Sequence, residues 1–122
     1  MAGTYNPTIR NNETWDLSLT LTRSDSTPFP LTGYTGKGQI KSPDGETVLA
    51  ALTVSVTNAD QGVLRVFLPL AQAETLEPTP TVAPPRYHLP IWDVILSNAD
   101  QSHVFTVIKG EVTIQAGVTH WT

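Results

Sequence analysis

Hydrophobic and polar residues alternate with a period of two along most of this chain. The first clear run has Trp15, Leu17, Leu19 and Leu21 between Asp16, Ser18, Thr20 and Thr22. Similar runs lie within residues 34–40, 52–57, 63–68, 87–96 and 103–114. Because successive side chains of a strand point to opposite faces, the pattern predicts strands with one buried face.

The alternation also predicts which residues point into the core. Two of the three tryptophans, Trp15 and Trp92, fall in phase with aliphatic neighbours and are expected inside. In "YTGKGQIKS" the glycines predict a bulge or a close backbone approach, and Pro90 predicts a break in the strand ladder. The other inward candidates are Tyr34, Gly36, Gly38, Ile40, Leu52, Val54, Val56, Leu64, Val66, Leu68, Tyr87, Leu89, Val94, Leu96, Val104, Ile108, Val112 and Ile114.

Turns and one helix separate these runs. "SPDG" at 42–45 suits a type I turn, and "TPFPLTG" is too rich in proline for a central strand. In "PLAQAETLEP", Pro69 suits the first helical position and Pro78 a stop, which predicts a short helix over residues 69–76. The proline-rich segment that follows, about 79–87, is expected to be extended.

About seven short strands and one helix predict an all-β, immunoglobulin-like antiparallel sandwich over residues 13–118. The helix and the proline-rich segment suit a crossover between two sheets. A small closed barrel is the alternative. Residues 1–12 are interpreted as a polar arm that is ordered only against a neighbour, and residues 119–122 as a tail.

The composition limits the classes of function that this chain can have. A chain of 122 residues is long enough for one domain with its own core. It has no cysteine, which fits a reducing cytoplasm or a particle assembled there. The net charge is −4 with scattered basic residues, which argues against nucleic-acid binding. Neither an apolar membrane span nor a signal peptide is recognisable.

The tetrapeptide Asn-Ala-Asp-Gln occurs twice, from Asn58 and from Asn98. Asp60 and Asp100 could be matched ligands of Ca²⁺, but each copy lacks the bidentate glutamate of a calcium loop. Asn and Asp also favour turns, and each copy lies between two alternating runs. The sequence therefore predicts the same hairpin turn used twice, with the second copy, beside His103, the better candidate for any binding.

No other motif predicts chemistry. The spacing of His88, His103 and His120 matches no metal site. "GYTGKGQ" lacks the spacing of a phosphate loop. General acid–base catalysis needs two carboxylates held at a defined separation, and nothing in the sequence selects such a pair among Asp16, Glu46, Asp93 and Glu111. We therefore expect no enzyme activity, no cofactor and no metal.

Three longer stretches resemble small immunoglobulin-like domains of tailed-phage proteins, and in particular the N-terminal domain of the baseplate upper protein family. They are "WDLSLTLTRSDSTPFPLTGYTGKGQIKSPDGETVLAAL", "GVLRVFLPLAQAETL" and "YHLPIWDVILSNAD…VFTVIKGEVTIQAGVT". The resemblance spans about residues 13–118. The chain departs from it at Ser26, where such domains commonly have glycine, and in a longer proline-rich insert at 78–85.

The resemblance implies a structural component of a bacteriophage virion, assembled in the host cytoplasm. The expected place is a tail, baseplate or fibre attachment, in symmetric copies and in contact with other virion proteins. The alternatives are a host-receptor or carbohydrate-binding module, in which Trp121 contacts glycans, and a capsid decoration or neck protein. The expected interface residues are Tyr5, Asn6, Pro7, Ile9, Arg10, Pro80, Val82, Pro84 and Trp121.

Overall fold

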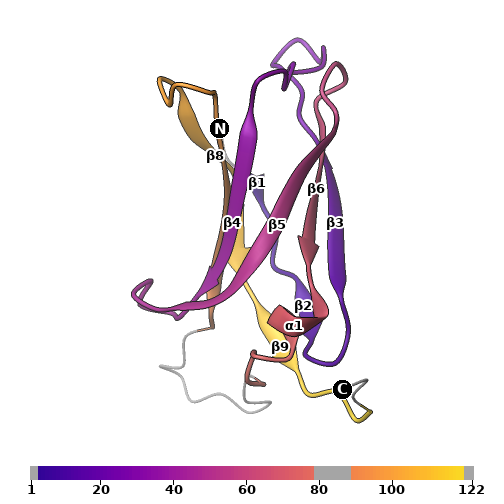
Figure 1. Cartoon of the computed structure of the whole chain (residues 1–122), viewed down its shortest axis with the longest axis vertical. Coiled ribbons are helices and arrows are strands. Elements are labelled where there is room, and N and C mark those ends of the chain that lie inside the picture. The colour runs from indigo at the N-terminus through magenta and orange to yellow at the C-terminus, as the bar shows by residue number, and fades with distance from the viewer. Residues whose placement is uncertain (1–2, 79–88, 120–122) are drawn as a thin grey trace.

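The chain is mostly β-structure with one short helix (Figure 1). The computed structural model describes residues 3–78 and 89–119. In that part of the chain the elements are β1 (Gly3–Thr4), β2 (Thr8–Arg10), β3 (Trp15–Thr20), β4 (Thr35–Lys41), β5 (Val48–Asn58), β6 (Val63–Leu68), α1 (Leu70–Ala73), β7 (Ile91–Ser97), β8 (Val104–Glu111) and β9 (Thr113–Gln115). The predictions of a β-rich chain and of one helix are confirmed.

Seven strands form one mixed sheet in the order β1-β8-β7-β4-β5-β6-β3, and β2 and β9 form a second, small sheet. The β1–β8 and β2–β9 pairs are parallel and the others are antiparallel. The long strand β5 changes partner along its length. Residues 48–52 pair with β4, and residues 53–58 pair with β6. In Figure 1, β5 runs diagonally from the side of β4 and β8 to the side of β6 and β3.

The sheet curls, so that strands far apart in its order face each other. Trp15 on β3 and Trp92 on β7 lie edge to face with ring centroids 5.7 Å apart, although β4, β5 and β6 separate their strands in the sheet. Trp92 is buried in the core, and Trp15 packs against it from the rim. The core therefore lies within the curve, as the placing of both tryptophans predicted.

Most inward positions are confirmed by burial. Leu64, Val66 and Leu68 on β6 and Val94 and Leu96 on β7 are fully buried. A Cβ added at Gly36 would lie 2.4 Å from the side chain of Val54 on β5, and one at Gly38 would lie 3.1 Å from that of Leu52. The glycines therefore make room for side chains of β5, and the predicted close approach of another backbone is not what surrounds them. Tyr87 lies outside the described residues.

Val104 is not inward, and that prediction is wrong. Its side chain is 51% exposed. The register between β7 and β8 shifts because Val94 pairs with Ile108 whereas Ile95 pairs with Thr106, so Val107 forms a bulge. One extra residue reverses the alternation. Phe105 therefore turns towards the core in place of Val104.

The N-terminal segment is part of the fold. β1 and β2 run beside β8 and β9, with Gly3 opposite Ile108 and Ile9 opposite Ile114. Ile9 is 1% exposed and belongs to the core. The expectation of an arm ordered only against a neighbour is wrong for the described residues 3–12, because this segment pairs with β8 and β9 of the same chain and buries Pro7 and Ile9.

The helix is shorter than predicted. Pro69 has an extended backbone and caps the helix instead of occupying its first turn, and α1 ends at Ala73. The Gln72 side chain accepts a hydrogen bond from the backbone N–H of Ala51 at 2.9 Å, which fixes α1 to β5. No helix in the described ranges is both long and apolar enough to cross a membrane.

Candidate interaction surface

Both copies of Asn-Ala-Asp-Gln form hairpin turns, as predicted. The first connects β5 to β6, and the second connects β7 to β8. In the first copy the left-handed residue is Gly62, with φ of 71°. The carbonyl of Gly62 accepts a hydrogen bond from the N–H of Leu21, and the carbonyl of Ala59 accepts one from Leu31. The β3–β4 connection therefore covers this turn.

The second turn is open to solvent and is built differently. Its left-handed residue is Gln101, with φ of 61°, one position earlier than in the first copy. Asn98 Oδ1 accepts the backbone N–H of His103 at 2.9 Å. Hydrogen bonds from the side chain and the N–H of Ser102 lower the pKa of the Asp100 carboxyl below its ordinary value. The polar side chains of Asn98 and Asp100 are therefore hydrogen-bonded within the turn that they stabilise.

An aromatic cluster stands beside the second turn. The exposed ring of His103 stacks on Phe105 with centroids 4.8 Å apart. The hydroxyl of Tyr34 and Nδ1 of His103 are hydrogen-bonded at 2.8 Å. Phe29 completes the cluster with ring contacts to Tyr34 and Phe105. His88 and His120 lie outside the described residues.

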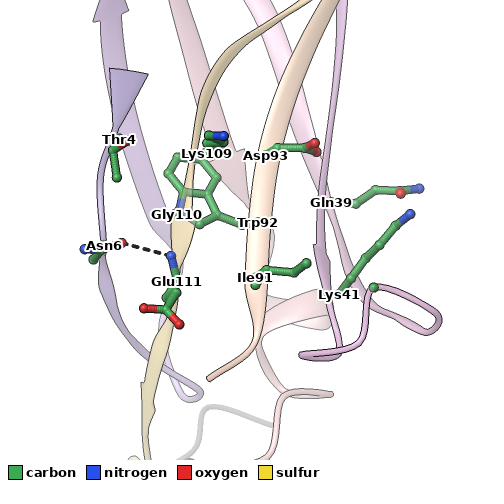
Figure 2. A pocket seen from close by; sticks show the side chains of 11 residues that line it. Thr4, Asn6, Gln39, Lys41, Ile91, Trp92, Asp93, Lys109, Gly110 and Glu111 are labelled. Atoms are coloured by element: carbon green, nitrogen blue, oxygen red, sulfur yellow. Dashed lines mark hydrogen bonds between the residues drawn. The ribbon is translucent and has the colours of Figure 1, made fainter. Parts of the chain in front are cut away.

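The outer face of β4, β7 and β8 is a second candidate surface, which we call the contact face. Its register places side chains in two rows across the strands. In the first row Gln39, Asp93 and Lys109 are opposite one another, and in the second Lys41, Ile91 and Glu111 are. These six side chains line a hollow of about 540 Å³. Figure 2 shows them, with Thr4 and Asn6 from the N-terminal segment at one side.

The contact face combines exposed aliphatic groups with charged groups that form no ion pair with another described residue. Ile91 is 37% exposed, and Val48, which pairs with Lys41, is 48% exposed. Within the described residues no ion pair within 4.0 Å joins any of the charged groups on this face. By contrast, Asp16 and Arg65 on the β3–β6 side form an ion pair at 2.7 Å, so Asp16 is already engaged.

The same face continues towards the second turn. A further hollow of about 420 Å³ lies there, and Thr35, Lys37, Ile95, Ser97 and Val104 are among the residues that line it. The bulge that turns Val104 outward thus adds an exposed aliphatic group to this face. Together the two hollows extend along β4 and β7 for most of their length.

The expected interface residues fall into three groups. Pro7 and Ile9 are buried in the chain's own core, so they are not available to another protein in this fold. Tyr5, Asn6 and Arg10 lie on the surface, and Asn6 lines the hollow of the contact face. Outside the described residues lie Pro80, Val82, Pro84 and Trp121.

Comparisons with protein families and with curated proteins do not assign this chain to a family. No protein-family model matches the chain, and no curated protein matches it either. In the described part of the chain, no group of three or more histidine and carboxylate side chains is placed to hold a metal ion. The function therefore has to be argued from the surfaces above.

Sequence reasoning missed the contact face although part of its signal is visible. "QIK", "WDV" and "KGE" each place a charged residue in the outward phase of a strand. What the sequence lacks is the register that sets Lys41, Ile91 and Glu111 in one row across three strands. The sequence places Asp93 and Glu111 among the candidates for a carboxylate pair, and the predicted interface includes neither.

Proposed function

We propose that this protein is a structural component of a bacteriophage virion, and that it acts through protein–protein contacts in a tail, baseplate or fibre attachment. The observation that carries the proposal is the contact face, where exposed Ile91 lies between Lys41 and Glu111. Exposed apolar groups rimmed by polar residues mark surfaces that contact other proteins. The resemblance of the sequence to phage domains supplies the virion context.

The proposal includes an immunoglobulin-like arrangement. The division of β5 between two partners supports it, because β1, β8, β7, β4 and the first half of β5 would form one layer. The second half of β5, with β6 and β3, would form the other. The edge-to-face contact of Trp15 and Trp92 would then lie between the layers. A strand that switches sheets is a known way of making such a corner.

Mass spectrometry of purified particles tests the virion role. Virions from an infected culture are banded by density, digested and searched for peptides of this chain. We expect its peptides at a fixed ratio to those of a tail protein. Absence of the chain from particles that infect normally would contradict the role. Labelling of intact particles with an antibody, viewed by electron microscopy, separates the tail from a capsid or neck position.

A host-receptor or carbohydrate-binding module is the second candidate, and the aromatic cluster favours it. An exposed ring stacked on another, beside polar turn residues, is a surface on which a sugar ring could lie. Glycan-array binding by the isolated protein, abolished in His103→Ala, is the result this candidate expects. Absence of binding at every glycan, with the protein shown to be folded, would exclude it for the glycans tested.

A further inference from the structure

We infer that the contact face binds a second copy of this chain, with Ile91 opposite Ile91 of the copy and two ion pairs between Glu111 and Lys41 across the interface. The inference deepens the proposed function, since it names a partner for the same face. The two can fail separately. Self-association is measured on the purified protein, whereas the virion role is measured on particles.

The row that contains Ile91 holds two opposite charges. Glu111 lies on one side of Ile91 and Lys41 on the other, each on the neighbouring strand. The backbones that carry the two charges are therefore two strand spacings apart, about 10 Å. Ile91 lies between them, and within the described residues no ion pair within 4.0 Å joins Lys41 and Glu111.

A second copy of the chain offers each of these two charges an opposite charge. The row reads negative, apolar, positive from β8 to β4. A two-fold axis through Ile91 and parallel to β7 reverses the row in the copy. Glu111 then faces Lys41 of the copy, Lys41 faces Glu111 of the copy, and the two isoleucines meet at the axis. A closed two-fold contact of this kind pairs the same patch with itself.

The neighbouring row sets the limit on affinity. Asp93 lies on the same strand as Ile91, two residues along, and so comes near Asp93 of the copy. Its cross-strand neighbour Lys109 supplies a counter-charge from the same chain. Like charges near the axis still oppose association. We therefore expect a weak dimer, and we expect Asp93→Asn to strengthen it.

Sedimentation velocity over a range of protein concentrations tests the inference by charge exchange. Glu111→Lys and Lys41→Glu each place like charges across the interface and should weaken dimerisation about tenfold or more. The double variant restores opposite charges and should recover the wild-type dissociation constant. Arg23→Glu and Glu13→Lys are the matched controls, because they make the same charge changes at exposed positions away from this face.

Each outcome decides for or against the inference. Circular dichroism first confirms that every variant is folded. Weaker association in both single variants with recovery in the double variant supports the pairing. A wild-type protein that stays monomeric at every concentration overturns the inference. So does a dimer that the single variants leave unchanged, or a double variant that does not recover.

Discussion

The indole N–H of Trp92 donates a hydrogen bond to the backbone carbonyl of Tyr5 at 2.8 Å, across 87 residues of sequence. The same carbonyl lies against Gly110, where any side chain would collide with it. Because Trp92 also meets Trp15 edge to face, one side chain connects the N-terminal segment, β7 and β3. This bond adds to the strand pairing and the burial of Ile9 that hold the N-terminal segment against the rest of the fold.

Trp92→Phe removes the indole N–H and leaves the backbone carbonyl of Tyr5 without this hydrogen bond. A polar group left unsatisfied in a partly buried place costs about 1–3 kcal/mol. We expect a loss of that size in chemical denaturation, with faster amide exchange at residues 5–9. Trp15→Phe is the control, since it trims a ring of the same pair without removing this hydrogen bond. Equal exchange at residues 5–9 in both variants would contradict the role of the bond.

Ile9→Ala tests whether the N-terminal segment belongs to the core. Ile9 is 1% exposed and pairs with Ile114. Replacing a buried isoleucine by alanine costs about 2–4 kcal/mol through lost burial and the cavity left behind. Arg10→Ala, at the exposed neighbouring position, should change the free energy of unfolding by less than about 0.5 kcal/mol. If both variants unfold like the wild type, the segment is not held as described.

Ser26→Gly is expected to stabilise the protein. Ser26 has φ of 69°, a left-handed backbone that favours glycine. Relief of the strain, less the greater freedom of glycine in the unfolded chain, should add about 0.5–1 kcal/mol. Thermal unfolding measures it, and Ser24→Gly, an exposed neighbour without a positive φ, should not gain stability.

Gly62→Ala is expected to destabilise the protein. It also distinguishes the two Asn-Ala-Asp-Gln turns. Gly62 has φ of 71°, and an added Cβ would lie 2.5 Å from the carbonyl oxygen of Leu21. Strain and collision together should cost more than about 1 kcal/mol. Ser102→Ala, at the corresponding position of the exposed second turn, should cost less. A larger loss from Ser102→Ala in thermal unfolding would contradict the assigned difference.

Acid should weaken three turns in a defined direction. Hydrogen bonds from a nearby serine or threonine, together with backbone N–H groups, lower the pKa of Asp25, Asp44 and Asp100. A carboxyl whose pKa is lowered by folding stabilises the fold above its unfolded pKa. That contribution is lost as the pH falls through the folded pKa.

The triple Asp→Asn variant keeps an oxygen acceptor at each of these positions but does not titrate there. Between about pH 5 and about pH 2.5, the melting temperature of the wild type should fall more steeply than that of the variant. Parallel curves over that range would show that the turn carboxylates do not contribute to the acid sensitivity.

The sequence predicted features that depend on neighbours along the chain. The inward faces of β6 and β7 and both hairpin turns follow from local alternation and from turn residues, and the structure has them. Val104 was misplaced because the bulge at Val107 depends on the pairing of β8 with β7. Ile9 was assigned to an interface instead of the core, because a lone isoleucine in a polar segment shows its burial only beside β9.

The contact face could not be predicted for the same reason. Lys41, Ile91 and Glu111 are separated by 50 and 20 positions in the chain, and only the register of three strands brings them into one row. Local patterns can say that each of the three points outward or inward. They cannot say that a positive and a negative group lie on either side of the same isoleucine.

The structure of the protein in its assembled state tests the contact-face proposal most directly. An electron-microscopy reconstruction of particles or purified oligomers would give the exposure of Ile91, which is 37% in the isolated chain. We predict that Ile91 is buried there, with Lys41 and Glu111 each within ion-pair distance of an opposite charge on another chain. An assembly in which Ile91 stays exposed and both charges face solvent would contradict the proposal.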